Sequence, residues 1–408
     1  MERVSPGLEQ LLDHHLNLVK GRRVGLITNA SGILPDLTDA RTALQAAGAH
    51  VVALFSPEHG LHAAAPDGTT VPSEREANGL PIYSLYGATR RPTPEMLAGL
   101  DVLLFDIQDI GARFYTYTWT MSLALEAAAE VGLSFIVLDR PNPIGGEIVE
   151  GPVLEPAYAS FLGRYPLPIR HGLTIGEIAR WLDGTLNLEA DLTVIPMKNW
   201  RREMFFDDTG LPWVPPSPAM PWPATALVYP GTCLIEGTNL SEGRGTALPF
   251  HLVGAPWIVG RRLAGVLNRL DLPGIHFRPV VFQPAAQKWA AQRCSGVQLH
   301  VTGRRAFRPV AVGLHLLATV QALYPDEFAW RRSSEEGERP HIDLLTGTDK
   351  VRRALDGGVS VADLVASWAD ELDQFARVCR PYILRHGSTA SSLPIVETSL
   401  TTQNSQIS

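Results

Sequence analysis

One segment of the chain combines acidic, amide, arginine and tyrosine side chains at a density that suits a binding site for a polar ligand. Residues 101–121 open with a β-prone apolar run at 102–105 and then turn abruptly polar. The polar residues are Asp106, Gln108, Asp109, Arg113, Tyr115 and Tyr117. A strand buried on both faces gains nothing from ending in such groups, whereas ligands of open α/β sheets bind at the carboxyl ends of the parallel strands. The segment therefore predicts one wall of a polar cleft.

A second polar segment lies in the other half of the chain, at residues 229–250. Glu236, Asn239, Glu242 and Arg244 are interleaved there with four glycines. Glycines let a backbone turn tightly or approach a ligand closely, so the segment suits a binding loop; the alternative is a turn with solvated charges. No GxxxxGKS/T occurs and no GxGxxG follows the first strand, so the sequence predicts no phosphate-binding loop.

Three more apolar runs, at residues 23–27, 50–55 and 134–138, also end in polar loops. The helical spacing of apolar residues between the runs predicts helices at residues 37–47 and 117–131. Strands that alternate with helices favour right-handed crossovers and a mostly parallel sheet, in which all four polar loops share one edge. Each loop alone could be a solvated connection, but four together favour a cleft. They add the candidate binding residues Asn29, Glu58, His59, Asp139, Arg140 and Asn142.

The rest of the chain indicates a second, smaller α/β domain. The proline-rich residues 213–223 cannot hold regular structure and mark the boundary. We expect a Rossmann-like catalytic domain at residues 1–222, a C-terminal domain that closes the cleft at 223–386, and a disordered tail at 387–408. Further elements expected from the pattern are strands at 192–197, 280–282 and 296–301, a helix with a capping box at 174–186, and helices at 257–270, 310–323 and 361–377.

Composition narrows the class of protein. The 408 residues carry a net charge of −7, which disfavours a nucleic-acid binder because that role needs a basic surface. No apolar run of about 18 residues predicts a membrane span, and no signal peptide is visible. We therefore expect a cytoplasmic protein, or an exported one if the natural N-terminus is longer. Three widely spaced cysteines suit a reducing compartment rather than a zinc site or disulfides. The sequence makes no prediction of oligomeric state.

Two further patterns have both a structural and a functional interpretation. Residues 58–62, EHGLH, resemble a zinc-protease motif, but that motif needs two histidines four residues apart on a helix, and these are three apart across a glycine. We therefore predict no metal and no cofactor. The aromatic residues at 114–119 could pack in the core, or, in an extended segment, could present Tyr115, Tyr117 and Trp119 on one side as a sugar-stacking face.

Eight segments of the chain occur in the order seen in one known family. They are SPEHG (56–60), YSLYG (83–87), FDIQDIGARFYTY (105–117), VLDRPNPIGG (137–146), RHGLTIGEIA (170–179), YPGTCLIEGTN (229–239), SEGRGT (241–246) and GAPW (254–257). Over about residues 8–385 the chain resembles the NamZ/YbbC-type exo-β-N-acetylmuramidases, bacterial glycoside hydrolases of peptidoglycan turnover. The resemblance implies a Rossmann-like domain, a smaller C-terminal domain and an active site between them. Its second motif also places Tyr86 among the candidate binding residues.

The resemblance implies a substrate as well as a fold. Members of the family release N-acetylmuramic acid (MurNAc) from the non-reducing ends of peptidoglycan fragments, so such fragments are the expected partners. The chain departs from the family pattern at places that flank the expected cleft. After PEHG, where relatives commonly carry an arginine and an acidic residue, it reads LHAAAPDG. Ala219 stands where asparagine is usual, and His251 stands where glutamate is usual.

The residues agree with glycosidase chemistry. Cleavage of a glycosidic bond needs a carboxylic acid that protonates the leaving oxygen and a second group that attacks or stabilises the oxocarbenium-like centre. Glu58 follows a buried strand and is the candidate acid, because an apolar setting would raise its pKa into the working range. Asp106 and Asp139 compete with Asp109 and Glu242 for the second role, which the 2-acetamido group of MurNAc could also fill.

The lactyl carboxylate of MurNAc calls for a bidentate arginine, and the candidates are, in order, Arg113, Arg140 and Arg244. Two other classes of protein stay open at this point. A non-catalytic muropeptide-binding protein would use the same arginines and aromatic residues without a placed acid. A nucleotide-dependent oxidoreductase or transferase would share the sheet, but it would need the glycine fingerprint that this chain lacks.

Overall fold

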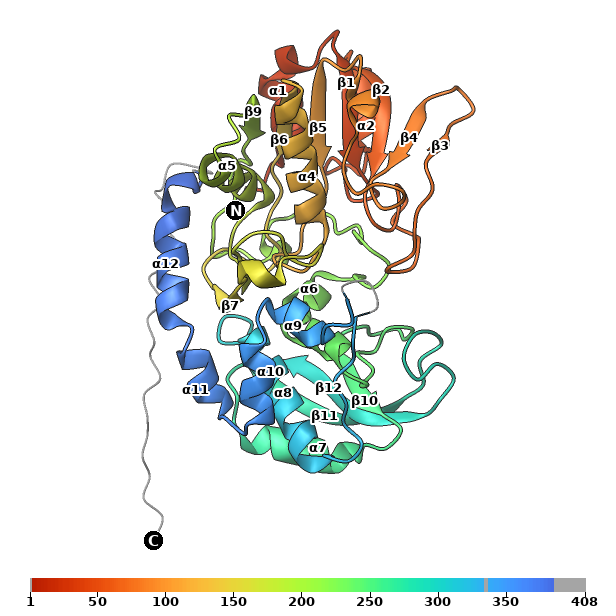
Figure 1. Ribbon diagram of the computed structural model, residues 1–408. Coiled ribbons are helices and arrows are strands. Elements are labelled where there is room, and N and C mark those ends of the chain that lie inside the picture. The colour runs from red at the N-terminus through yellow and green to blue at the C-terminus, as the bar shows by residue number, and fades with distance from the viewer. Residues whose placement is uncertain (1, 334–336, 385–408) are drawn as a thin grey trace.

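Figure 1 shows the computed structural model of the chain, which describes residues 2–333 and 337–384. The chain forms two α/β units stacked on each other, with a seven-stranded sheet in the first and a three-stranded sheet in the second. The tail predicted at residues 387–408 lies outside the described residues. Among the helices that are described, none is long and apolar enough to cross a membrane.

The first sheet has the strand order β3-β4-β2-β1-β5-β6-β9, and every neighbouring pair except β3–β4 is parallel. Its strands are β1 (Arg23–Thr28), β2 (His50–Ser56), β3 (Glu74–Arg75), β4 (Pro81–Ser84), β5 (Val102–Asp106), β6 (Ser134–Leu138) and β9 (Leu192–Ile195). The predicted Rossmann-like, mostly parallel sheet is confirmed. Because β1, β2, β5 and β6 run in the same direction, the polar loops that follow them leave from one edge of the sheet.

Helices cover both faces of this sheet. They are α1 (Gly7–His14), α2 (Ala40–Ala46), α3 (Pro94–Leu97), α4 (Tyr117–Glu130) and α5 (Ile175–Leu186). β5 is buried along its whole length, because Leu103 and Phe105 belong to the apolar core on one face and Leu104 to the core on the other. α5 starts with the predicted capping box, in which Thr174 and Glu177 each accept a hydrogen bond from the other's backbone N–H.

The second unit is built around the antiparallel sheet β10-β12-β11. Its elements are α6 (Pro223–Thr232), β10 (Leu252–Ala255), α7 (Gly260–Arg269), β11 (Ile275–Phe282), β12 (Cys294–Val301), α8 (Pro309–Leu323), α9 (His341–Thr346) and α10 (Lys350–Asp356). α6 and α8 cross at two glycines: a Cβ on Gly231 would lie 1.8 Å from the carbonyl oxygen of Pro309, and one on Gly313 would lie 2.3 Å from that of Gly231. A larger residue would separate the helices, so glycine fixes the crossing near the start of the second polar segment, residues 229–250.

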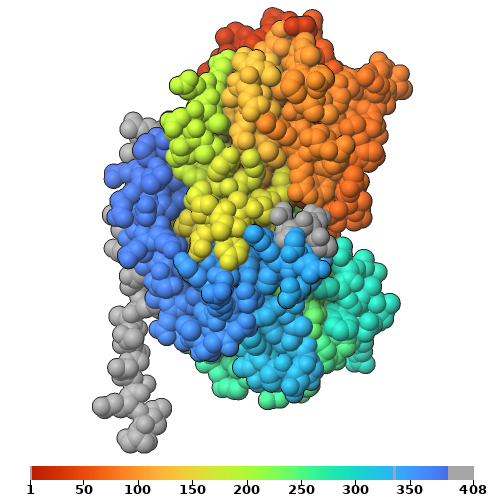
Figure 2. Space-filling model, in the orientation of Figure 1, coloured from red at the N-terminus to blue at the C-terminus, as the bar shows by residue number. Residues whose placement is uncertain are grey.

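The helix predicted at residues 361–377 is two helices, α11 (Val361–Ala366) and α12 (Ala369–Cys379). The chain bends between them because α12 leaves the second unit and packs against the first, on the hairpin of β7 (Glu150–Val153) and β8 (Pro168–Arg170). Figure 2 shows this C-terminal segment lying against both units. The described residues also contain the short 3₁₀ helices η1 (Leu16–Leu18), η2 (Pro156–Tyr158), η3 (Phe206–Asp208), η4 (Cys233–Gly237) and η5 (Arg380–Tyr382).

Candidate active site

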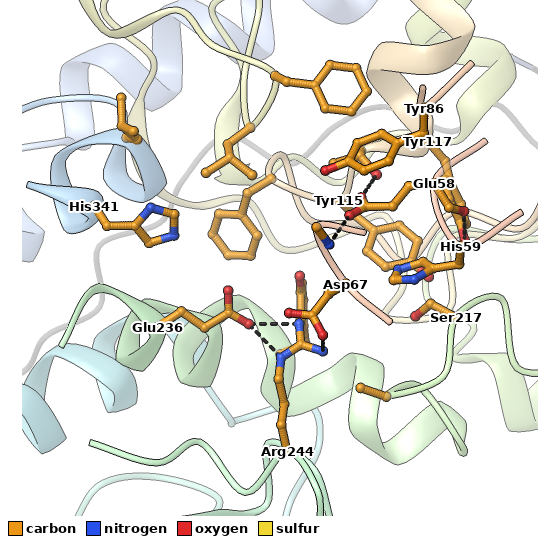
Figure 3. A pocket seen from close by; sticks show the side chains of 18 of the residues that line it. Glu58, His59, Asp67, Tyr86, Tyr115, Tyr117, Ser217, Glu236, Arg244 and His341 are labelled. Atoms are coloured by element: carbon orange, nitrogen blue, oxygen red, sulfur yellow. Dashed lines mark hydrogen bonds and ion pairs between the residues drawn. The ribbon is translucent and has the colours of Figure 1, made fainter. Parts of the chain in front are cut away.

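A cavity of about 290 Å³ lies between the two units. The first unit contributes loops that follow β2, β4 and β5, and the second unit contributes the segment after α6 and the start of α9. Figure 3 shows how these side chains face one another across the cavity. The polar and aromatic residues that line it include Glu58, His59, Asp67, Tyr86, Arg90, Tyr115, Thr116, Tyr117, Phe161, Ser217, Tyr229, Glu236, Arg244, Phe250, Gln287, Arg331 and His341.

Glu58 reaches the cavity through a tight turn at the end of β2. The N–H of Gly60 donates to the carbonyl oxygen of Pro57 at 3.0 Å. His59 has a φ of 69° and Gly60 a φ of 76°, so a non-glycine residue adopts the left-handed conformation directly beside the carboxyl group. Such strain is retained where the surrounding structure holds a functional group in place. His59 Nδ1 donates to the carbonyl oxygen of Ala65 at 2.7 Å, which fastens the loop that follows.

The Glu58 carboxyl group lies in a polar setting, in contrast to the apolar one expected from its place after a buried strand. Oε1 accepts a hydrogen bond from the backbone N–H of Gly68 at 3.0 Å, and Oε2 accepts one from the Thr116 hydroxyl at 2.7 Å. Thr116 stands at the N-cap of α4 but does not cap the helix with its side chain. Both oxygens of Glu58 are therefore held in place while the side chain keeps 8% of its surface exposed, toward the cavity.

Tyrosine side chains form the wall beside Glu58. The ring of Tyr115 makes edge contacts with Tyr117 at 4.8 Å and with Tyr229 at 6.0 Å between centroids. The Tyr117 hydroxyl donates to the carbonyl oxygen of Pro216 at 2.5 Å. The Tyr115 hydroxyl is buried beside Ser217 and Tyr117, and no hydrogen bond of good geometry satisfies it. Burial raises the pKa of both phenols, so both stay protonated.

The aromatic face proposed from the sequence differs from the one that forms. An extended segment would place Trp119 beside Tyr115 and Tyr117, but α4 begins at Tyr117 and alternation ends there. Trp119 is fully buried in the core, where its indole N–H donates to the carbonyl oxygen of Arg113 at 2.7 Å. Tyr115 and Tyr117 alone reach the cavity from this run of alternate residues.

Arg244 lies on the opposite side of the cavity within a ring of carboxylates. Its guanidinium contacts Glu236 at 2.8 Å, Asp67 at 3.5 Å and Glu242 at 3.6 Å, and it stacks on the ring of Phe250 at 4.8 Å. Burial alone would lower the pKa of Arg244, but these negative charges raise it above its ordinary value. Asp67 belongs to the first unit and Arg244 to the second, so this ion pair joins the two units at the cavity.

Asp106 and Arg140 lie outside the cavity and bind each other. The Asp106 carboxylate accepts from Arg140 Nε at 2.6 Å and from Nη2 at 2.8 Å, and Nη2 also donates to the carbonyl oxygen of Ile33. Asp106 is completely buried and Arg140 keeps 5% of its surface exposed. The pair ties the ends of β5 and β6 to the loop after β1. The geometry therefore supports a structural role for both, in place of the catalytic and binding roles predicted from the sequence.

Asp139 is also buried away from the cavity. Its carboxylate accepts from the Thr174 hydroxyl and from the Gly176 N–H, both at 2.9 Å, at the N-terminus of α5. Asp109 accepts from the N–H of Gly111 at 2.7 Å and from the Thr118 hydroxyl at 3.2 Å. Burial raises the pKa of Asp109 to about 6. Neither carboxyl group faces the space in which a substrate would lie.

Arg113, the first candidate to bind the lactyl carboxylate, is completely buried in the structure and does not line the cavity. Its guanidinium donates to three carbonyl oxygens: Pro152 at 2.9 Å, Leu167 at 2.7 Å and Leu345 at 2.7 Å. Leu345 belongs to α9, so Arg113 connects the loop after β5 to the second unit. Burial lowers the pKa of Arg113 to about 9, which leaves the group charged at neutral pH.

The remaining predicted binding residues hold loops in place. Asn29 donates to the carbonyl oxygen of Pro216 at 3.0 Å, and Gln108 donates to those of Asp109 and Pro141. Asn142 bonds Leu173, Asn239 bonds Glu327 and Ala329, and Glu242 pairs with Lys288 at 2.8 Å. None of these five residues lines the cavity.

The crevice at the ends of β1 and β5, where the strand order reverses, is the usual ligand site of such a sheet. Here the proline-rich segment lies over it, and the space left beside Ser31, Gln108 and Arg140 is about 20 Å³. The Pro216 carbonyl oxygen of this segment accepts from both Asn29 and Tyr117. A nucleotide has no room there, and the cavity lies farther along the edge, beside the loops after β2 and β4 and residues 114–117 of the segment after β5.

Several cavity residues could not be predicted from the sequence. Asp67, Arg90, Phe161, Arg331 and His341 come from loops or short helices without a periodic pattern, so composition gave no signal for them. The guanidinium of Arg90 stacks on Phe161 at 4.4 Å and on Tyr86 at 5.3 Å. The departure LHAAAPDG was a usable signal, since its Asp67 and Gly68 line the cavity, as does the departing residue Ala219.

Known proteins similar to this chain share both of its units. Family models described as "Exo-beta-N-acetylmuramidase NamZ, N-terminal" and "Exo-beta-N-acetylmuramidase NamZ, C-terminal" match residues 24–224 and 227–384. The "Peptidoglycan beta-N-acetylmuramidase NamZ" of Bacillus subtilis (strain 168) is 47% identical over 384 residues, which is 94% of this chain and 91% of that protein.

Two solved structures of DUF1343 family proteins from Bacteroides fragilis NCTC 9343 have the same fold. One has a TM-score of 0.85 and 38% identity, and covers 94% of this chain and 99% of its own. The other has a TM-score of 0.74 and 31% identity, and covers 95% of this chain and 100% of its own.

Proposed function

Because this chain belongs to the exo-β-N-acetylmuramidase NamZ family, we propose that the cavity between its two units is the site where it hydrolyses the bond of a terminal MurNAc residue. The chain is a glycosidase, an exo-acting hydrolase that releases MurNAc from non-reducing ends, and the alternative of a non-catalytic binding protein falls away. Peptidoglycan fragments that end in MurNAc are its proposed substrates. Its location in the cytoplasm stays a prediction that the three unpaired cysteines support.

The general acid is assigned from the ion pairs of the three carboxyl groups that line the cavity. Asp67 and Glu236 both pair with Arg244, whereas Glu58 has no ion pair within the described part of the chain. A general acid must hold a proton at the working pH, and a carboxyl group beside a guanidinium holds a proton least well. Glu58 is therefore the proposed general acid.

The neighbours of Glu58 suit a group that gives up a proton and regains it. Gly68 N–H is a fixed donor to Oε1. The Thr116 hydroxyl donates to Oε2 and can rotate to accept when that oxygen carries the proton. Protonation of the glycosidic oxygen lets the bond break, and charge develops at the anomeric carbon. Since both other carboxylates of the cavity are ion-paired, the 2-acetamido group of MurNAc is the proposed partner that attacks this carbon.

The site also offers groups that would hold the sugar. The unsatisfied Tyr115 hydroxyl is protonated and can donate to a substrate oxygen, which would remove the cost of leaving it buried without a partner. For the lactyl carboxylate, Arg113 and Arg140 are used inside the protein and Arg244 is surrounded by acidic groups. Arg331 lines the cavity from the second unit, and no described side chain pairs with its guanidinium. We assign the reading of the lactyl carboxylate to Arg331.

Replacing Arg331 with methionine is expected to reduce the preference for MurNAc over N-acetylglucosamine (GlcNAc) glycosides by about 10-fold or more. The two sugars differ only in the lactyl ether, and a site built around a charged group strongly rejects a ligand that lacks it. The measurement is kcat/KM for a matched pair of glycosides. Arg332→Met is the control, because Arg332 is the next residue but does not line the cavity. An unchanged preference in Arg331→Met would assign the carboxylate to another group, with Arg90 next.

Catalysis is expected to be independent of metal ions. In residues 2–333 and 337–384 no three potential metal ligands come together, and His59 uses Nδ1 to bond Ala65. Treatment with EDTA should leave the rate of MurNAc release unchanged. A loss that zinc or magnesium restores would contradict this expectation.

The decisive test of the function is turnover. The purified protein, incubated with a MurNAc–GlcNAc disaccharide, is expected to release free MurNAc, measured by chromatography. A reducing-end MurNAc in the reversed disaccharide should not be released, because the enzyme acts from the non-reducing end. Binding without release of the sugar would contradict the proposal.

A further inference from the structure

We propose that Asp67 is a positioning residue that sets the general acid through contact between the two units. The side chain of Asp67 is held by the second unit, and the backbone of the next residue, Gly68, holds Glu58. Contact between the units at this point therefore fixes the orientation of the Glu58 carboxyl group. The inference rests on the proposed role of Glu58.

The loop that carries Asp67 follows Glu58 in the sequence and folds back to contact the Glu58 carboxyl group. It leaves from His59, whose carbonyl oxygen accepts from the N–H groups of Ala64 at 3.0 Å and Ala65 at 3.1 Å. It returns at Gly68, whose N–H donates to Glu58 Oε1 at 3.0 Å. Gly68 has a φ of +68°, a conformation that glycine adopts without strain. The loop thus places a fixed hydrogen-bond donor on the catalytic carboxyl group.

The second unit holds this loop through the side chain of Asp67. Asp67 Oδ1 accepts from Gln287 Nε2 at 3.1 Å and lies 3.5 Å from Arg244 Nη1. Arg244 is itself held by two hydrogen bonds to Glu236, at 3.0 and 2.8 Å, and by the ring of Phe250. Figure 3 shows Asp67 between Glu58 and Arg244.

Apart from the hydrogen bonds that hold Ala64 and Ala65 to His59, few contacts support the part of the loop that follows. Ala64, Pro66, Gly68 and the two threonines after it are exposed, so their side chains do not pack in a core. Exposed loops with few contacts are easily displaced unless a specific contact holds them. Loss of the Asp67 side chain should therefore release Gly68 from Glu58 while the fold and the rest of the cavity stay intact.

The test compares two substrates whose leaving groups differ in their need for a proton, and this difference separates a role in acid catalysis from other roles. A GlcNAc leaving group needs a proton from the acid, whereas 4-nitrophenolate leaves without one. Asp67→Ala is expected to lower kcat for the MurNAc–GlcNAc disaccharide about 10-fold and kcat for 4-nitrophenyl MurNAc less than about 2-fold, with KM little changed. Gln287→Ala, which removes the exposed partner of Asp67, should show the same pattern more weakly. Asp326→Ala, at another exposed loop aspartate, is the control.

Two outcomes would overturn the proposal. An unchanged kcat for the disaccharide in Asp67→Ala would show that the contact does not set the acid. Equal losses on both substrates would show that Asp67 acts on the sugar or on the fold rather than through Glu58. Failure of the proposed function shows itself elsewhere, as a wild-type protein that does not release MurNAc or as wild-type turnover by Glu58→Gln.

Discussion

Replacement of Glu58 by glutamine is expected to lower kcat for a MurNAc–GlcNAc disaccharide by at least about 10²-fold, the scale of losing a general acid. Glutamine has the same shape: its amide oxygen can accept from the Gly68 N–H, and its NH2 group can donate to the Thr116 hydroxyl oxygen, so the fold should survive. What it cannot do is give a proton to the leaving oxygen. Steady-state kinetics on the disaccharide, with circular dichroism to verify folding, measure the effect.

A comparison of two leaving groups tests the role of Glu58 more specifically than the rate on the disaccharide alone. The loss in Glu58→Gln should be much smaller for 4-nitrophenyl MurNAc, because 4-nitrophenolate departs without protonation. A matched control is Glu126→Gln on α4, since Glu126 is also partly buried and accepts hydrogen bonds, but from Arg164 and Tyr165 outside the cavity. Near-normal turnover of the disaccharide by Glu58→Gln would remove Glu58 from the mechanism.

Replacement of Arg113 by methionine is expected to destabilise the protein strongly without changing its sugar preference. The substitution leaves three buried carbonyl oxygens, of Pro152, Leu167 and Leu345, without their donor. Buried acceptors that lose a partner cost about 1–3 kcal/mol each, so a loss of at least about 3 kcal/mol in the free energy of unfolding is expected. Thermal unfolding should show a Tm lower by several degrees.

The same variant distinguishes the structural role from the binding role that the sequence suggested. The ratio of kcat/KM for MurNAc and GlcNAc glycosides in the folded protein should equal that of the wild type, because Arg113 does not line the cavity. Arg305→Met, at a side chain that is 64% exposed, should leave Tm unchanged. A stable Arg113→Met variant that loses its preference for MurNAc would restore Arg113 as the reader of the carboxylate.

The sheet, the family and the strongest candidate for the acid could all be predicted from the amino-acid sequence. Alternating strands and helices predict parallel crossovers because each strand needs a helix to return the chain, and the observed sheet has this order. The capping box of α5 and most helix positions also follow from local pattern, since helix termini are set by residues three or four positions apart. Glu58 could be proposed because it follows directly on β2.

Which of the polar loops stay open to a substrate depends on contacts between residues far apart in the sequence, so it follows from the fold alone. Asn29 is occupied by a carbonyl group 187 residues away, and Arg113 by one 232 residues away. The charged residues at the ends of β5 and β6 were candidates for the site, yet Arg140 and Asp106 form an ion pair with each other there. The cavity instead opens after β2, where Asp67 meets Arg244 from the other unit. The side chains of Asn29 and Arg113 are bound inside the protein because folding brings them these partners, and partners this distant leave no trace in local residue spacing.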